Sequence, residues 1–242
     1  SDSSSTQIQN QIPVFDSLSL SETSINNGET IECLASVSDE DNEIPTLVYS
    51  WENATTGSAL GTNYSLTLIP STATSQDLIV CTVTATDGYG GSITDTVSFT
   101  VENTAPIFTI PATITPNTGV TTSDSLTCSG LAIDSDGLLP TLAYSWVNTT
   151  TGSSLGSSFS VTLNTSTSAP ADVITCTITA TDSDGETETS VAVVSVENSV
   201  PVISSMTLSP DPAYTNDGLT ATTVASDSDG DSLSFEYAWS VD

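Results

Sequence analysis

The sequence contains no lysine, no arginine and no histidine among its 242 residues, but 30 aspartates and glutamates, so its formal net charge is −30. Proteins bind nucleic-acid phosphates and anionic lipid surfaces mainly through Lys and Arg, so we expect neither as a partner. No carboxylate can form an ion pair with a side chain of this sequence. Each must instead be solvated, hydrogen-bonded to backbone N–H groups, bound to a metal ion or paired with another molecule.

The missing bases also argue against an enzyme. Ser and Thr are abundant, but no His or Lys is present to activate them as nucleophiles. The only candidates for acid–base catalysis by two carboxylates are the Asp-Ser-Asp-Gly loops. These loops recur from repeat to repeat, which is typical of a structural feature rather than of an active site. We therefore predict no catalytic residues. No stretch approaches the roughly 20 apolar residues of a membrane span, so we expect no direct membrane insertion by this segment.

Two cysteines flanking a tryptophan occur twice, 95 residues apart (33 to 128, 51 to 146 and 81 to 176). A third, partial copy begins after Pro201 and reaches Trp239, with Ala221 near the position of the first cysteine. A fixed period of this size indicates one structural unit copied in tandem. The predicted divisions are a tail of a preceding repeat or linker (1–12), repeat 1 (13–103), repeat 2 (104–198) and an incomplete repeat 3 (199–242).

Each complete repeat contains one pair of cysteines at the same separation. This arrangement predicts the disulfides Cys33–Cys81 and Cys128–Cys176, and hence an oxidising, extracellular setting. Metal binding by the cysteines is the alternative, but the sequence has no Cys-x-x-Cys spacing and no His to support it.

Apolar and polar residues alternate along short runs of the second repeat, at Leu142–Trp146, Phe159–Leu163 and Ile174–Thr181. This period of two is typical of strands with one buried face, and turn-forming residues separate the runs. No segment has the pattern of a helix. Short strands with Cys, Trp and Cys in that order indicate a two-sheet sandwich whose Trp packs on the disulfide. The predicted fold class is all-β, with tandem immunoglobulin-like β-sandwich domains in an elongated array.

Four stretches support a family resemblance: Tyr144-Ser-Trp146, the run from Cys176 to Gly185, the junction ending at Pro201, and Ser226–Asp231. On these the chain resembles immunoglobulin-like repeats, and more closely the polycystic-kidney-disease-type and cadherin-like repeats of large microbial extracellular proteins. The resemblance implies a structural role as a shaft, stalk or filament on a microbial surface, with copies of the same chain as neighbours in a fibre. It also implies that calcium stiffens the junctions between repeats.

In such a sandwich the loops after the second and sixth strands lie at the same end as the incoming linker, and acidic residues gather in these places. Carboxylate and amide oxygens without nitrogen or sulfur ligands favour Ca²⁺. The same Asp-x-Asp-Gly pattern is also typical of an ordinary solvated turn. The first repeat offers fewer candidate acids in these places, namely Asp39, Asp41 and Asp87, and is expected to bind most weakly. The candidate metal ligands are Asp39, Asp41, Asp87, Glu102, Asn103, Asp134, Asp136, Asp182, Asp184, Glu197, Asn198, Asp227, Asp229 and Asp231.

Four asparagines fit the N-glycosylation pattern, namely Asn53, Asn63, Asn148 and Asn164. Asn53 and Asn148 occupy equivalent positions, on turns just after the Trp that we expect to be exposed. Glycans are therefore possible partners of this chain, as attachments or as ligands.

An alternative function is an adhesin or a module that binds a carbohydrate or a partner through the loops at one end. Tyr89 is the candidate aromatic residue for such a surface. The aromatic pairs ending at Trp51, Trp146 and Trp239 are instead expected in the core, because they lie on alternating strands. The third repeat is expected either to belong to a longer array or to be completed by strands of a neighbouring molecule.

Overall fold

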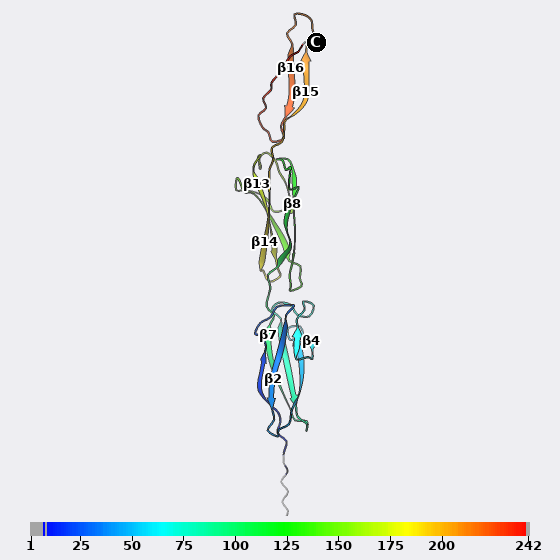
Figure 1. Ribbon diagram of the computed structural model, residues 1–242, viewed down its shortest axis with the longest axis vertical. Coiled ribbons are helices and arrows are strands. Elements are labelled where there is room, and N and C mark those ends of the chain that lie inside the picture. Colours follow the sequence, from blue (N-terminus) through cyan, green and yellow to red (C-terminus); the bar gives the residue numbers. More distant parts are fainter. Residues whose placement is uncertain (1–6, 8, 241–242) are drawn as a thin grey trace, which may run out of the picture. The chain divides into compact units, whose positions relative to one another are not determined.

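The computed structural model describes residue 7 and residues 9–240, and within them it contains strands, turns and loops but no helix (Figure 1). The predicted all-β class is confirmed. Of the predicted tail 1–12, residues 1–6 and 8 lie outside the described part. No helix of membrane-spanning length and apolarity is found among the described residues. The chain divides into two compact units: Ser1–Ile107 with Ile133–Pro140 and Thr181–Glu186, and Phe108–Ala132 with Thr141–Ala180 and Thr187–Asp242.

The first repeat folds into two sheets that enclose one core. One sheet has the order β1-β2-β5 and the other has the order β4-β3-β6-β7. Trp51 on β3 pairs in register with Cys81 on β6, and Cys81 forms a disulfide with Cys33 on β2, so the bond joins the two sheets. The strands are β1 (Val14–Leu20), β2 (Thr30–Ser38), β3 (Thr46–Asn53), β4 (Ser58–Gly61), β5 (Ser65–Thr67), β6 (Leu78–Thr86) and β7 (Ser92–Thr100).

The second repeat reproduces this architecture, with sheets in the orders β12-β9-β8 and β11-β10-β13-β14. The predicted Cys128–Cys176 disulfide is present and again joins the two sheets. Trp146 is fully buried in the same core, and its Nε1 donates to the Ser158 carbonyl at 2.9 Å. The strands are β8 (Ile107–Thr115), β9 (Ser125–Ile133), β10 (Thr141–Asn148), β11 (Ser153–Gly156), β12 (Ser160–Thr162), β13 (Val173–Thr181) and β14 (Thr187–Ser195).

Strand β13 shows why this sequence forms a sandwich. Its residues alternate between fully buried positions, such as Ile174 and Ile178, and partly exposed threonines. Because successive side chains of a strand point to opposite faces, this pattern buries one whole face. Burial of an Ile side chain contributes about 1.5–3 kcal/mol, so the apolar face sets the register.

The third repeat has one two-stranded sheet in its described part, formed by β15 (Val202–Ser209) and β16 (Thr220–Ser226). The expectation that its aromatic residues lie in a core is wrong for Tyr237 and Trp239, which are 44% and 56% exposed. Both rings line a pocket with Met206, Leu208 and Ala221 of β15 and β16, but no second sheet among the described residues covers them.

Candidate functional site

Two aspartates from separate loops hold the segment that enters the first sandwich. The side-chain Nδ2 of Asn10 donates to Asp87 Oδ2 at 2.8 Å. The backbone N–H of Gln11 donates to Asp41 Oδ2 at 2.6 Å. Asp41 follows β2 and Asp87 follows β6, so the ends of both sheets bind the incoming chain. We call this pair of hydrogen bonds, and its counterparts in the other repeats, the linker clamp.

The second repeat forms the same clamp. Asn103 Nδ2 donates to Asp182 Oδ2 at 2.9 Å, and the Thr104 backbone N–H donates to Asp136 Oδ2 at 2.8 Å. The Thr104 hydroxyl donates to the same oxygen at 2.9 Å. Asp136 follows β9 and Asp182 follows β13, which are the counterparts of β2 and β6.

The third repeat supplies one half of the clamp from the loop after β16. The backbone N–H and the hydroxyl of Ser199 donate to Asp229 Oδ2 at 2.5 and 2.6 Å. A hydrogen bond from the linker backbone to the second aspartate of the early loop therefore occurs in all three repeats, at Asp41, Asp136 and Asp229. A feature that recurs with different linker sequences is a property of the repeat rather than of one loop.

The first aspartate of each early loop shapes the turn. Its Oδ1 accepts a hydrogen bond from the backbone N–H two residues later, in the geometry of an Asx turn. The predicted turn-forming role of these acids is thus present in all three repeats. The bonds are Asp41 to Asp39 at 2.8 Å, Asp136 to Asp134 at 2.7 Å and Asp229 to Asp227 at 2.8 Å.

Two of the clamp aspartates, Asp136 and Asp229, also accept hydrogen bonds from the preceding repeat. Asn27 Nδ2 donates to Asp136 Oδ1 at 3.0 Å in the first unit. Thr122 Oγ1, at the position equivalent to Asn27, donates to Asp229 Oδ1 at 2.8 Å in the second unit. Both carboxylate oxygens of Asp136 and of Asp229 are therefore hydrogen-bonded.

Three clamp aspartates have a pKa below the usual 3.8. For Asp87 the main cause is the hydrogen bond from the Asn10 amide, and for Asp229 it is the bond from the linker serine hydroxyl. For Asp182, desolvation raises the pKa, but the bonds from Asn103 and from backbone N–H groups outweigh it and the pKa is lowered. Hydrogen bonds to the charged form favour ionisation, so the clamp is made for carboxylates rather than carboxylic acids.

Acidification is therefore expected to weaken the clamp. Because its pKa is lowered on folding, Asp182 stabilises the fold fully above pH 3.8, and this stabilisation is lost as the pH falls through its folded-state pKa. Protonation also reduces the repulsion among the carboxylates of this chain, whose net charge is −30, and this affects the wild type and a variant alike. The informative quantity is therefore the difference between their melting temperatures. Melting temperatures of the wild type and of Asp182→Asn, measured from pH 6 to pH 2, should converge toward low pH. A constant difference across this range would contradict the assignment.

Three oxygens in this region lack any partner in the described residues, namely Asn27 Oδ1 and one oxygen each of two aspartates. Asp39 Oδ2 and its counterpart Asp134 Oδ2 are shielded from solvent and accept no hydrogen bond. Burial raises the pKa of Asp134, and the nearby negative charges of Asp136 and Asp182 raise it further. A buried acceptor without a donor is costly, and a metal ion is one partner that would satisfy it.

A group of three carboxylates forms in the first repeat, where the sequence suggested the fewest ligands. Asp39, Glu43 and Asp87 have oxygens within 4.8 Å of one another. Sequence reasoning missed Glu43, although it lies just two residues beyond Asp41. In the second repeat Leu138 replaces it, and no group of three forms there among the described residues. A second group, in the third repeat, consists of Asp227, Asp229 and Asp231.

Several other predicted ligands lie elsewhere. Glu197 accepts a hydrogen bond from the Gly119 backbone at 2.9 Å, and Asn198 donates to the Ser199 carbonyl at 2.6 Å. The Asp184 carboxylate accepts the Ser75 hydroxyl. Glu102 is exposed. Among them the three acids, Glu102, Asp184 and Glu197, join neither group of three carboxylates in the described part of the chain.

The predicted exposure of two glycosylation sites is wrong. Asn53 and Asn148 are fully buried, and their Nδ2 atoms, to which a glycan would attach, each donate two hydrogen bonds inside the loop. The cause is a carboxylate that the sequence pattern did not reveal, Asp77 in the first repeat and Asp172 in the second. Asn63 and Asn164 are exposed, so they remain the candidates for glycosylation.

No protein-family model matches the chain, and no curated protein matches it. The insect immune protein hemolin is 14% identical, with a TM-score of 0.41, and the match covers 80% of this chain and 49% of hemolin. A segment of two fibronectin type-III domains from chicken tenascin is 12% identical, with a TM-score of 0.36, and coverage is 75% and 99%. A tetra-tandem repeat in the extending region of a large adhesion protein is 12% identical, with a TM-score of 0.37, and coverage is 90% and 64%. The chain therefore spans about half the length of hemolin.

Proposed function

We propose that this chain is a structural segment of an extracellular protein, built of tandem immunoglobulin-like sandwiches that serve as a shaft, stalk or filament on a microbial surface. The linker clamp is the observation that carries the proposal. In each repeat, an acidic loop binds the incoming chain through its backbone and fixes how the repeat begins. Repeats that are tied at their linkers suit a mechanical role. Two inter-sheet disulfides support an oxidising, extracellular location.

We further propose that Ca²⁺ binds at the clamp. The residues fit a hard cation, because the sites offer carboxylate oxygens and the chain contains no basic side chain to compensate them. The buried, unpartnered oxygens of Asp39 and Asp134 support the same assignment. In the first repeat Asp39, Glu43 and Asp87 would hold the ion, which would neutralise their mutual repulsion and stiffen the loops that bind the linker.

Calcium is expected to raise the melting temperature of the chelator-treated protein. Extracellular modules bind Ca²⁺ with a Kd of about 10⁻⁴–10⁻³ M, so about 10 mM would stabilise each site by roughly 1.4–2.7 kcal/mol. Differential scanning calorimetry across a calcium titration measures this, with NaCl at equal ionic strength as the reference. A response no larger than that of the sodium reference would exclude specific sites.

Two variants locate the response. Glu43→Gln should remove most of the response of the first repeat, whereas Asp95→Asn, on an exposed edge strand outside both carboxylate groups, should retain it. Asp134→Asn keeps the oxygen that accepts the Asp136 N–H and removes the charge. In the presence of chelator, the Asp134→Asn variant should have a melting temperature no lower than that of the wild type. On addition of calcium, the second repeat of this variant should show no stabilisation.

A further inference from the structure

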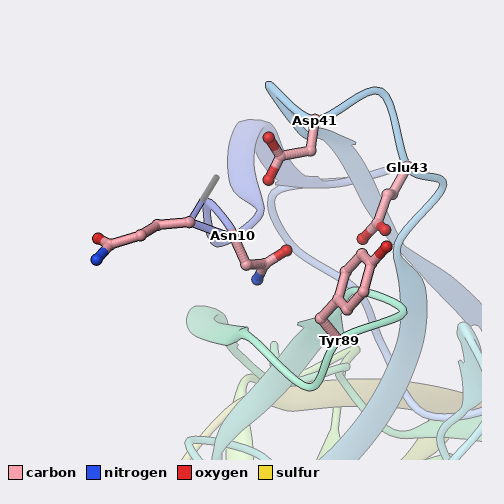
Figure 2. A pocket seen from close by; sticks show the side chains of 5 residues that line it. Asn10, Asp41, Glu43 and Tyr89 are labelled. Carbon is pink, nitrogen blue, oxygen red and sulfur yellow. The ribbon is translucent and has the colours of Figure 1, made fainter. Parts of the chain in front are cut away.

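The first sandwich has a pocket that shares Asn10 and Asp41 with the linker clamp. It is lined by Gln9, Asn10, Asp41, Glu43 and Tyr89 and has a volume of about 460 Å³. Figure 2 shows the side chains of Asp41, Glu43 and Tyr89 around one opening, with the Tyr89 hydroxyl directed toward the Glu43 carboxylate. All five residues belong to the first compact unit.

Tyr89 distinguishes this pocket from the equivalent place in the second repeat. Its side chain is 78% exposed and belongs to neither hydrophobic core. The turn that presents it is fixed, because the Tyr89 and Gly91 backbone N–H groups both donate to Asp87 Oδ1 at 2.8 Å. The second repeat has Asp184 at the position of Tyr89 and Leu138 at that of Glu43, so it lacks both the ring and the acid.

The pocket is rich in negative charge without a positive counterpart. Asp41 and Glu43 line it, and oxygens of Asp39 and Asp87 lie within 4.8 Å of a Glu43 oxygen. The Gly88 N–H donates to Glu43 Oε2 at 3.2 Å, which holds this carboxylate at the edge of the pocket. A cation gains attraction from every one of these groups, whereas a neutral ligand leaves their mutual repulsion in place. An aromatic face adds a further attraction that is specific to cations.

We propose that this pocket binds a lysine or arginine side chain presented by a protein partner. The cationic group lies against the Tyr89 ring, and Asp41 and Glu43 accept its hydrogen bonds. The partner is not another copy of this sequence, which contains no basic residue. The inference goes beyond the structural function and does not depend on calcium, although Ca²⁺ held by Glu43 would compete with the basic side chain.

The test is an NMR titration of the whole chain with Nα-acetyl-lysine amide in EDTA, at about 0.15 M NaCl, where diffuse attraction to the charged chain is screened. Saturable shifts are expected at the backbone amides of Glu43, Gly88 and Tyr89, and not at those of Leu138 and Asp184. Tyr89→Ala should weaken binding about two- to five-fold, as the loss of an exposed cation–π contact does. Tyr89→Phe keeps the ring and should bind as the wild type does.

Three results would overturn the proposal. Equal shifts with the Nε-acetylated probe would show that the charge is not recognised. Unchanged affinity in both Tyr89→Ala and Glu43→Gln would show that binding is diffuse. Saturable binding of N-acetylglucosamine at the same amides, without binding of the lysine probe, would assign the pocket to a neutral sugar. Because the titration is run in EDTA, a failure of calcium binding would not change its outcome, so the two proposals fail separately.

Discussion

Replacement of both Cys128 and Cys176 by alanine is expected to lower the free energy of unfolding of the second sandwich by about 4 kcal/mol. The disulfide joins residues 48 positions apart, and in the chain-entropy model a loop of this length strongly restricts the unfolded chain. The two cysteines are also buried in the core around Trp146, so their loss removes packing at the point where the sheets meet.

Native-state hydrogen exchange resolves this effect because it reports the opening of each sandwich separately. Amides of β13 should exchange faster in the variant, and those of β6 should not change. The matched control replaces Cys33 and Cys81, which have the same separation, and should reverse this pattern. A loss below about 1 kcal/mol in β13 would mean that sheet packing alone keeps the reduced chain compact.

The fold could be predicted because its determinants are local or covalent. The period-two pattern of Ile174–Thr181 requires no knowledge of distant residues to indicate a half-buried strand. The repeated spacing of cysteine, tryptophan and cysteine then indicates two sheets joined by a disulfide. Trp239 shows the limit of this reasoning: the same pattern places a ring in a core only where an opposing sheet is present.

The acidic loops were predictable as a group but not in their detail. The sequence places aspartates after equivalent strands, and the structure shows these loops binding the linker. The sequence alone does not reveal that the Asn10 side chain contacts Asp87, 77 residues away, because this contact depends on how two loops fold. For the same reason Glu43 joins Asp39 and Asp87 in the first repeat, although the sequence suggested fewer candidate ligands there than in the second repeat. Counting acids along the chain does not rank sites whose ligands converge in space.

Asn148 shows a second limit. Its sequence context, Asn-Thr-Thr after a strand, is typical of an exposed turn that could carry a glycan. In the structure the side chain is instead the centre of a buried polar network with Asp172. Buried polar groups are tolerated when they are fully hydrogen-bonded, and no local pattern tells such a residue from a solvated one.

Asn148→Ala is expected to destabilise the second sandwich by about 3 kcal/mol. The Asn148 Nδ2 donates to Asp172 Oδ2 at 2.7 Å and to the Thr167 carbonyl at 3.1 Å. Its Oδ1 accepts the backbone N–H groups of Thr150 and Thr151 at 3.2 and 3.3 Å. Alanine removes all four bonds and leaves a carboxylate that is 7% exposed with one fewer donor, in a chain without a basic residue to replace it.

A double-mutant cycle separates the network from simple loss of volume. If the loss arises because the Asp172 carboxylate is left without a donor, Asn148→Ala combined with Asp172→Ala should destabilise by less than the sum of the two single changes. The shortfall from additivity should be about 1–3 kcal/mol. Asn63→Ala provides the control, because this asparagine also belongs to a sequon but is exposed, and in the described residues it bonds to Trp51 through its backbone carbonyl, which alanine keeps; its replacement should change stability by no more than about 0.5 kcal/mol. Additive losses in the cycle would mean that Asn148 acts through its bonds to the turn backbone rather than through Asp172. Hydrogen exchange of β10 and β13 is the measurement, since these strands flank the network.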